Sequence, residues 1–289
     1  MLRVYQCRPC LPRIGYNLEC RLEGRRSIAL PGEPQEAMFR TVFFVTAFVL
    51  THASLLLLIP FTRQRLLLCA LLFGTGTCYL LWVLFHPRNQ WLVDARWKVT
   101  CPDRQPCVAL TFDDGPSGPA TEQLLDTLRD KGVKASFFLV GERAEKYPGI
   151  ARRIRSEGHQ IGNHTYSHPA LFCFLTPSRL REEIERGQEA IGRITGEKPR
   201  LFRSPVGLRH ALLRPYLQHA GLEYISWCIR SFDTVDGASV RARIAGSVES
   251  GDIVLLHDNP RSLAQNMANV IPQIIDDLQG KGYRLVPVQ

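Results

Sequence analysis

The sequence predicts an α/β fold, an irregular (β/α)7-type barrel that is preceded by an N-terminal transmembrane helical hairpin. Two observations predict the barrel. Residues 107–289 alternate apolar runs with helical runs about seven times, which implies a parallel sheet. The notable polar residues of this region all follow apolar runs, and barrel active sites form at the C-terminal ends of strands. Two uncharged apolar stretches, 41–61 and 66–85, predict the hairpin.

The alternation can be followed run by run. The run 108–114 (VALTFDD) is short and apolar before its two aspartates, which is typical of a buried strand. Thr176 can cap the clearest helix, with Pro177 at its first helical position. The expected strands are 108–114, 133–141, 159–165, 199–205, 222–229, 252–258 and 283–288. The expected helices are 119–132, 144–158 with an interruption at Pro148, 176–196, 213–221, 239–251 and 266–282.

Each of the two apolar stretches is about 20 residues long, enough to cross roughly 30 Å of hydrocarbon. Buried core helices are the alternative, but neither stretch has a polar face. The short segment FTRQR, residues 61–65, joins the stretches, so we expect a tight hairpin with both chain ends on one side. We expect four parts in the chain: an uncertain leader over 1–37, two transmembrane helices over 38–86, a linker over 87–106, and a catalytic domain over 107–289.

The orientation of the hairpin depends on where translation starts. If the arginine-rich segment 1–37 is present, the positive-inside rule puts the N-terminus in the cytoplasm. If translation starts at Met38, only Arg40 precedes the first span, and Arg63 and Arg65 become the stronger cytoplasmic signal. We expect the second case, in an inner (cell) membrane, with the catalytic domain on the periplasmic or extracytoplasmic side.

The positive charge of the chain is concentrated around the apolar stretches. The net charge is +9, of which residues 1–100 contribute +7 and residues 101–289 only +2. This distribution fits membrane topology better than a nucleic-acid groove, so we expect no nucleic-acid partner. No G-x-G-x-x-G or P-loop motif is present.

Cys101 and Cys107 flank a loop and could pair if the domain is exported.

Two neighbouring aspartates, Asp113 and Asp114, end the first expected strand of the domain. Successive side chains on a regular strand point to opposite faces, so the two carboxylates are expected to have different functions. Another expected strand, 159–165, ends near His164, and His168 follows it, which gives the spacing H-x-x-x-H. We expect a strand end and one helical turn to bring both imidazoles together. Two histidines and one carboxylate commonly bind a divalent metal and leave a position open for water.

The domain resembles the polysaccharide deacetylase family, also called the NodB-homology domain or carbohydrate esterase family 4. TFDDG at 111–115 and HTYSH at 164–168 match the family's first two motifs. Its third motif, R-x-P-x-G, appears at 203–207. Its fourth appears as Trp227 and Asp233, and its fifth, L-x-H, as 255–257. The five motifs occur in order over 107–289.

The resemblance implies a role for each matched residue. Asp114, His164 and His168 match the metal ligands, and Asp113 matches the general base that activates the attacking water. His257 matches the general acid for the leaving amine. The remaining matched positions have supporting roles. Arg203 is implied to hold Asp113, and Asp233 is implied to hold His257. The implied substrate-binding residues are Pro205, Val206 and Leu255, with the Val206 N–H as an oxyanion donor.

Three departures affect the sugar site. The third motif usually has proline and an aromatic residue where this chain has Ser204 and Val206. Asp233 is followed by Thr234 instead of the usual tryptophan. The aspartate that usually precedes it is Arg230 here. Metal ligands, base and acid are unaffected, and Trp227 is expected to pack in the core.

We therefore expect a metal-dependent hydrolase that removes N-acetyl groups from amino sugars of a glycan, such as peptidoglycan, a chitin-like polymer or another exported polysaccharide. Zn²⁺ is the default ion for the ligand set, and other divalent ions fit as well. The expected partners are the N-acetylated glycan and the membrane, and the oligomeric state is left open. The alternatives are a deacylase or deformylase of a lipid-linked sugar, and a catalytically silent carbohydrate-binding relative.

Overall fold

The computed structural model describes residues 47, 50, 51, 54, 63–235, 239–259 and 267–289. The expected leader, 1–37, and most of the first expected span, 41–61, lie outside the described residues. The strands are β1 (Ala95–Arg96), β2 (Cys107–Gly115), β3 (Ser136–Leu139), β4 (Gln160–Asn163), β5 (Leu201–Phe202), β6 (Glu223–Ile225), β7 (Ile229–Arg230), β8 (Ile253–His257) and β9 (Arg284–Leu285). The helices are α2 (Arg63–Phe85), α3 (Pro119–Asp130), α4 (Gly141–Lys146), α5 (Pro148–Ser156), α6 (Pro177–Thr195), α7 (Leu213–Ala220), α8 (Val240–Ser247) and α10 (Met267–Gly280).

All the strands form one parallel sheet, as the alternation of strands and helices predicts. Their order is β1-β6-β5-β4-β3-β2-β8-β7, and β9 pairs with β2. The segment 223–230 pairs through β6 with β5 and β1, and through β7 with β8 at the other end of the sheet. One stretch of chain therefore connects the two ends of the sheet, which gives the sheet the curvature of a half-barrel.

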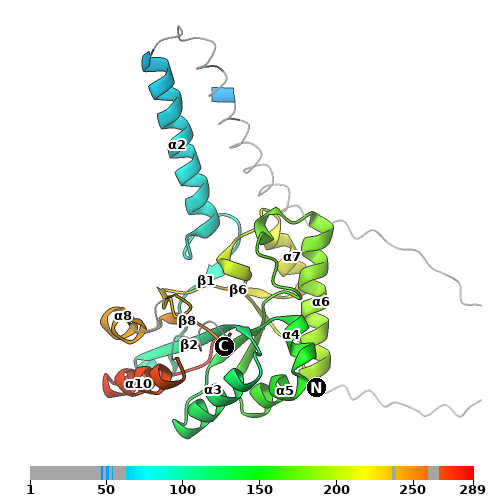
Figure 1. Ribbon diagram of the computed structural model, residues 1–289, viewed down its shortest axis with the longest axis vertical. Coiled ribbons are helices and arrows are strands. Elements are labelled where there is room, and N and C mark those ends of the chain that lie inside the picture. The colour runs from blue at the N-terminus through cyan, green and yellow to red at the C-terminus, as the bar shows by residue number, and fades with distance from the viewer. Residues whose placement is uncertain (1–46, 48–49, 52–53, 55–62, 236–238, 260–266) are drawn as a thin grey trace, which may run out of the picture. The chain divides into compact units, whose positions relative to one another are not determined.

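The two faces of the sheet have different cores. Phe112 of β2 and Phe137 of β3 stack on the outer face, with ring centroids 5.3 Å apart, and lie in the core that helices cover. The inner face carries a smaller core with Ala109, Phe138 and Trp227. Trp227 is buried, as expected. Helix α10 contacts both α8 and α3, and α5 contacts both α3 and α6, so these helices form a continuous outer layer (Figure 1).

Helix α6 begins and ends where the sequence predicts. The Thr176 side chain accepts a hydrogen bond from the Arg179 N–H at 3.4 Å, and Pro177 is the first helical residue. The helix ends at Gly196, which is left-handed with φ 80°. The predicted interruption at Pro148 is also present, because α4 ends at Lys146 and α5 begins at Pro148.

Two segments differ from the sequence-based expectation. The expected linker 87–106 contains β1, which extends the sheet beside β6. The single expected strand 222–229 is two short strands, because the three residues between β6 and β7 carry the chain from one end of the sheet to the other. Cys101 and Cys107 form a disulfide with Cα atoms 5.4 Å apart, and Cys107 is the first residue of β2.

Within the described residues, one helix is long and apolar enough to cross a membrane. It covers Leu66–Phe85 of α2, and few of its residues are buried. This stretch coincides with the second predicted span. At the base of α2, the buried Arg209 donates hydrogen bonds of 2.7 and 2.6 Å to the backbone carbonyls of His86 and Pro87.

Candidate active site

The polar residues singled out from the sequence meet at the C-terminal ends of neighbouring strands. In the parallel register, Asp113 of β2 lies opposite His257 of β8. On the other side, β2 is followed by β3 and β4, and His164 comes directly after β4. Arg203 follows β5, the next strand in the sheet. Strand order therefore assembles the site from residues up to 144 positions apart in the chain.

Asp113 is held by a buried arginine. Arg203 Nη1 donates to Asp113 Oδ1 at 2.6 Å and to Thr111 Oγ1 at 2.9 Å. Its other nitrogens donate to the backbone carbonyls of Ile225 and Ser226. The guanidinium carbon also lies 4.1 Å from the ring centroid of Phe138. Arg203 is fully buried, so these contacts fix both its position and the orientation of the Asp113 carboxylate.

Asp114 faces the same site, because β2 is irregular at its end. The register between β2 and β3 shifts between Asp113 and Gly115, and Asp114 has a left-handed φ of 72°. A regular ladder would point the two carboxylates to opposite faces, but this bulge brings both toward His164. His164 Nε2 lies 3.9 Å from Asp113 Oδ2 and 3.5 Å from Asp114 Oδ1.

The two histidines converge on the Asp114 carboxylate. His168 Nε2 lies 3.0 Å from Asp114 Oδ1, and the two imidazole centroids are 5.0 Å apart. Burial acts to raise the pKa of Asp114, but the hydrogen bonds and charges of both histidines outweigh it and hold the pKa well below its usual range. The convergence does not come from the expected helical turn. Thr165 and His168 are both left-handed, with φ of 68° and 55°.

The geometry of this trio fits a divalent metal ion. In the part of the chain that the structure describes, Asp114, His164 and His168 form a group whose ligand atoms all lie within 4.8 Å of one another. His164 Nδ1 lies 2.7 Å from the Arg203 carbonyl oxygen. With that carbonyl as acceptor, Nδ1 carries the proton and Nε2 presents its lone pair to the site, as metal-binding histidines require. Two imidazoles and one carboxylate are a donor set that zinc accepts.

Helix α6 supports the loop that carries the two histidines, which the sequence did not reveal. Ser167 donates to the buried Glu183 from its N–H and its hydroxyl, both at 2.8 Å. Asn163 Oδ1 accepts from the Thr165 N–H at 2.9 Å. A Cβ on Gly187 would lie 2.5 Å from that same Oδ1, so α6 approaches the loop as closely as only glycine allows.

Asn259 is a further site residue that sequence reasoning missed. Its Nδ2 donates to Asp114 Oδ2 at 2.7 Å and so orients the oxygen that the histidines do not contact. Its neighbour Asp258 is buried and accepts from Thr121 Oγ1 at 2.7 Å. Burial raises the pKa of Asp258 to about 7, although the Thr121 hydrogen bond opposes the shift. A signal was available, because both residues continue the strand that ends in His257.

His257 forms a pair with Asp233 on the wall opposite the histidine loop. Asp233 Oδ1 lies 2.7 Å from His257 Nδ1, and Asp233 Oδ2 accepts from the His257 N–H at 2.7 Å. Burial acts to lower the pKa of His257, but the hydrogen bond and charge of Asp233, with the charges of Asp113 and Asp114, raise it above its ordinary value. The pair therefore favours the protonated imidazole near neutral pH.

The three expected substrate-contact residues occupy different environments. Pro205 and Leu255 are buried, and Leu255 belongs to the inner core. Val206 is 47% exposed and left-handed with φ 58°. Ser204 is buried with its hydroxyl 2.7 Å from the Tyr224 hydroxyl. The residue in place of the family's proline therefore points away from solvent, and Val206 alone of this turn is well exposed.

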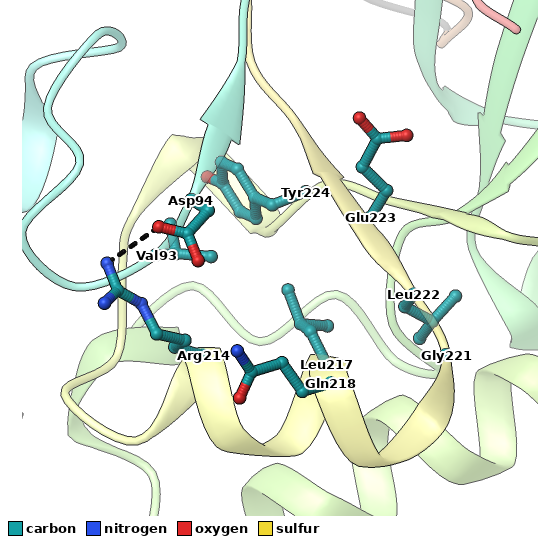
Figure 2. A pocket seen from close by; sticks show the side chains of 9 residues that line it. All are labelled: Val93, Asp94, Arg214, Leu217, Gln218, Gly221, Leu222, Glu223 and Tyr224. Atoms are coloured by element: carbon teal, nitrogen blue, oxygen red, sulfur yellow. Dashed lines mark ion pairs between the residues drawn. The ribbon is translucent and has the colours of Figure 1, made fainter. Parts of the chain in front are cut away.

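A hollow of about 340 Å³ lies away from these residues. Its lining includes Asp94 and Arg214, an ion pair at 3.0 Å, together with residues of α7 and the start of β6 (Figure 2). It contains none of the predicted catalytic or metal-ligating residues. The hollow lies at the amino end of β6, whereas the site forms where the strands end.

The family model and the similar curated proteins indicate the same family. Residues 101–225 match the family model described as polysaccharide deacetylase. The chain is 37% identical over 201 residues to a peptidoglycan-N-acetylglucosamine deacetylase of Bacillus cereus, covering 68% of this chain and 72% of the relative. It is 32% identical over 191 residues to the peptidoglycan-N-acetylmuramic acid deacetylase PdaC of Bacillus subtilis, of which it covers 39%.

Solved structures give the same result. The crystal structure of the peptidoglycan N-acetylglucosamine deacetylase Bc1960 superposes with a TM-score of 0.62 at 35% identity. That match covers 67% of this chain and 90% of the other. The structure of PdaC from Bacillus subtilis superposes with a TM-score of 0.57 at 31% identity, covering 64% and 89% of the two chains.

Proposed function

Since this chain belongs to the polysaccharide deacetylase family, we propose that it removes N-acetyl groups from the amino sugars of a glycan. The observation that carries the proposal is the meeting of three groups at one end of the sheet. These are the carboxylate–histidine trio around Asp114, the arginine-held Asp113, and the His257–Asp233 pair. Peptidoglycan is the first substrate to test, because the relatives compared above are named as peptidoglycan deacetylases.

The proposed base and the proposed acid lie on two different walls of the site. Asp113 is the general base, because Arg203 orients its carboxylate toward the centre. His257 is the general acid for the leaving amine, because Asp233 favours its protonated form. The Val206 N–H is the proposed donor to the oxyanion, and Pro205 and Leu255 shape the adjacent wall.

Asp114, His164 and His168 are the proposed ligands of a divalent ion, with Zn²⁺ as the first choice. When bound, such an ion polarises the acetamide carbonyl and lowers the pKa of water. Asn259 and the Arg203 carbonyl hold the ligands in position from outside the trio.

We also propose that the enzyme is tethered to a membrane. The apolar stretch Leu66–Phe85 is consistent with the second helix of the expected hairpin over 38–86. The Cys101–Cys107 disulfide is typical of oxidising compartments, which supports a domain on the extracytoplasmic side. The proposed catalytic domain covers 107–289, and β1 adds part of the segment before it to the sheet.

Two rivals make different predictions. A deacylase of a lipid-linked sugar would use the same residues close to the membrane. A catalytically silent relative would lack a ligand or the base, whereas this chain retains the three proposed ligands and the proposed base.

The test is acetate release by the purified full chain from chitin oligomers and from peptidoglycan fragments, before and after chelation. We expect acetate from at least one glycan, loss of activity with the chelator, and recovery with Zn²⁺. Bound metal without acetate from either glycan would favour the lipid-linked substrate. Absence of both metal and acetate would favour the silent relative.

A further inference from the structure

Arg230 lies on the same face of the sheet as the catalytic residues. It is the last residue of β7 and pairs with Leu255 of β8. Partners in a parallel ladder point to the same face, and Leu255 shares its face with His257 two residues later. The preceding pair, Ile229 and Val254, lies in the core of the opposite face, which confirms the alternation.

Strand geometry places Arg230 close to the proposed general acid. With strands about 4.8 Å apart and a rise of about 3.3 Å per residue, the Cα atoms of Arg230 and His257 are roughly 8 Å apart. Arg230 is exposed, whereas its partner Leu255 is buried. The long arginine side chain can therefore reach a ligand that occupies the site.

The ring of Phe232 holds this cation in place, and a second arginine lies against the same ring. The guanidinium carbons of Arg230 and Arg243 each lie 5.2 Å from the ring centroid of Phe232. Phe232 is 44% exposed and has a left-handed φ of 59°, and it directly precedes Asp233. Arg243 is anchored through Ser231 and Ser239. Among the described residues, the Arg230 guanidinium contacts Phe232 and forms no ion pair.

The acidic groups of the site do not neutralise Arg230. Asp113 pairs with Arg203, Asp114 pairs with the two histidines, and Asp233 pairs with His257. Each carboxylate already has a cationic or hydrogen-bonding partner. Arg230 therefore adds positive charge to the rim of the site, with its planar set of donors available for a carboxylate.

We propose that Arg230 determines substrate specificity by binding an anionic substituent of the glycan, a carboxylate carried near the acetamido group that is hydrolysed. This inference rests on the proposed deacetylase function and narrows its substrate class from neutral N-acetylated glycans to carboxylate-bearing ones. Arg230 binds and positions the sugar, and takes no part in proton transfer. Phe232 fixes the direction of the guanidinium through its ring.

The test compares one glycan in two charge states. Peptidoglycan strands stripped of their peptides carry lactyl carboxylates, and amidation of these groups gives an uncharged glycan with the same acetamido groups. For the full chain, we expect a higher kcat/KM on the carboxylate form, by about three- to tenfold. Added salt should reduce this ratio, because the contact is exposed. The ratio is kcat/KM on the carboxylate form divided by kcat/KM on the amidated form. In Arg230→Gln this ratio should fall to about one, and in Arg230→Glu it should fall below one.

Arg152→Gln is the matched control. Arg152 is exposed on α5, in the outer helical layer, so its loss changes the net charge equally without affecting the rim. The kcat/KM ratio of Arg152→Gln between the two glycan forms should equal that of the unsubstituted chain. If the unsubstituted chain shows no preference, or if Arg230→Gln keeps the preference, the inference is wrong while the deacetylase function stands. Absence of acetate from both glycans would overturn the function and this inference together.

Discussion

Among individual residues, the partners of each side chain explain how two adjacent aspartates can differ in function. Asp113 contacts a buried guanidinium, which holds its carboxylate in position without a metal. Asp114 contacts two imidazoles and an amide, groups that orient a carboxylate around an ion. The left-handed backbone of Asp114 creates this division, because it turns the second carboxylate back into the site.

The pair His257–Asp233 predicts a change in pH dependence. A general acid must be protonated, and Asp233 raises the pKa of His257, so activity should persist to higher pH than an isolated imidazole allows. Asp233→Asn removes the charge that raises this pKa. The basic limb of the kcat/KM profile should therefore move to lower pH by about one unit. The measurement is the pH profile of both proteins.

Asp130→Asn is the control for this prediction, because Asp130 lies on the surface of α3 with its side chain 70% exposed. Its profile should match that of the unsubstituted chain. An unmoved basic limb in Asp233→Asn would remove His257 from the role of general acid.

Sequence motifs predicted the residues that converge at the strand ends better than the residues that position them. Asp113, Asp114, His164 and His168 lie in recognisable motifs at predicted strand ends, and the structure brings them together. Glu183 acts through two hydrogen bonds to the histidine loop, and Asn259 acts through one hydrogen bond to Asp114. A glutamate within an amphipathic helix looks like a surface residue until the position of the helix is known, so tertiary contact alone identifies such residues.

Among the helices and strands, α6 directly contacts the loop that carries both histidines. It holds Ser167 through Glu183 and packs Gly187 directly against the loop that carries both histidines. The geometry of the histidines therefore depends on how closely a helix approaches a loop.

Gly187→Ala tests this dependence. The added Cβ would lie 2.5 Å from Asn163 Oδ1 and 2.9 Å from the Thr165 carbonyl carbon, so the loop or the helix must move. We expect destabilisation of about 1–3 kcal/mol, as for overpacking elsewhere, together with weaker metal binding. Urea unfolding and a metal titration measure the two effects.

Gly149→Ala is the matched helical control, because a Cβ there meets nothing within 4 Å. It should leave metal binding unchanged and be neutral or stabilising by up to about 1 kcal/mol. Equal behaviour of the two variants would show that α6 does not set the geometry of the loop.

The strands explain where prediction from sequence was incomplete. The run 222–229 is uniformly suited to a strand, yet the chain leaves β5 and joins β8 within it. Residues 95–96 have no long apolar run, and they form β1 only because the edge of β6 is available. Both features depend on closing a curved sheet, which local sequence preference does not encode.

For the chain as a whole, the apolar helix and the disulfide are consistent with the proposed arrangement, in which the domain is held outside the cytoplasm at a membrane. This arrangement predicts the behaviour of reporter fusions. A reporter that is active only in the periplasm, fused after Gln289, should be active, and a cytoplasmic reporter at the same position should be silent. The reverse pattern would place the domain in the cytoplasm and favour the arginine-rich segment 1–37 as a genuine N-terminus.

The most direct test of the proposed chemistry is the metal content and deacetylation rate of Asp113→Asn and Asp114→Asn across a metal titration. Asp113→Asn should keep bound metal and lose turnover by about 10²–10⁴-fold, because the amide cannot accept a proton. Asp114→Asn removes an anionic ligand, so it should lose metal affinity and recover part of its activity when metal is added. Loss of metal from Asp113→Asn with full metal and activity in Asp114→Asn would reverse the assignment, and normal turnover in both would place the site elsewhere.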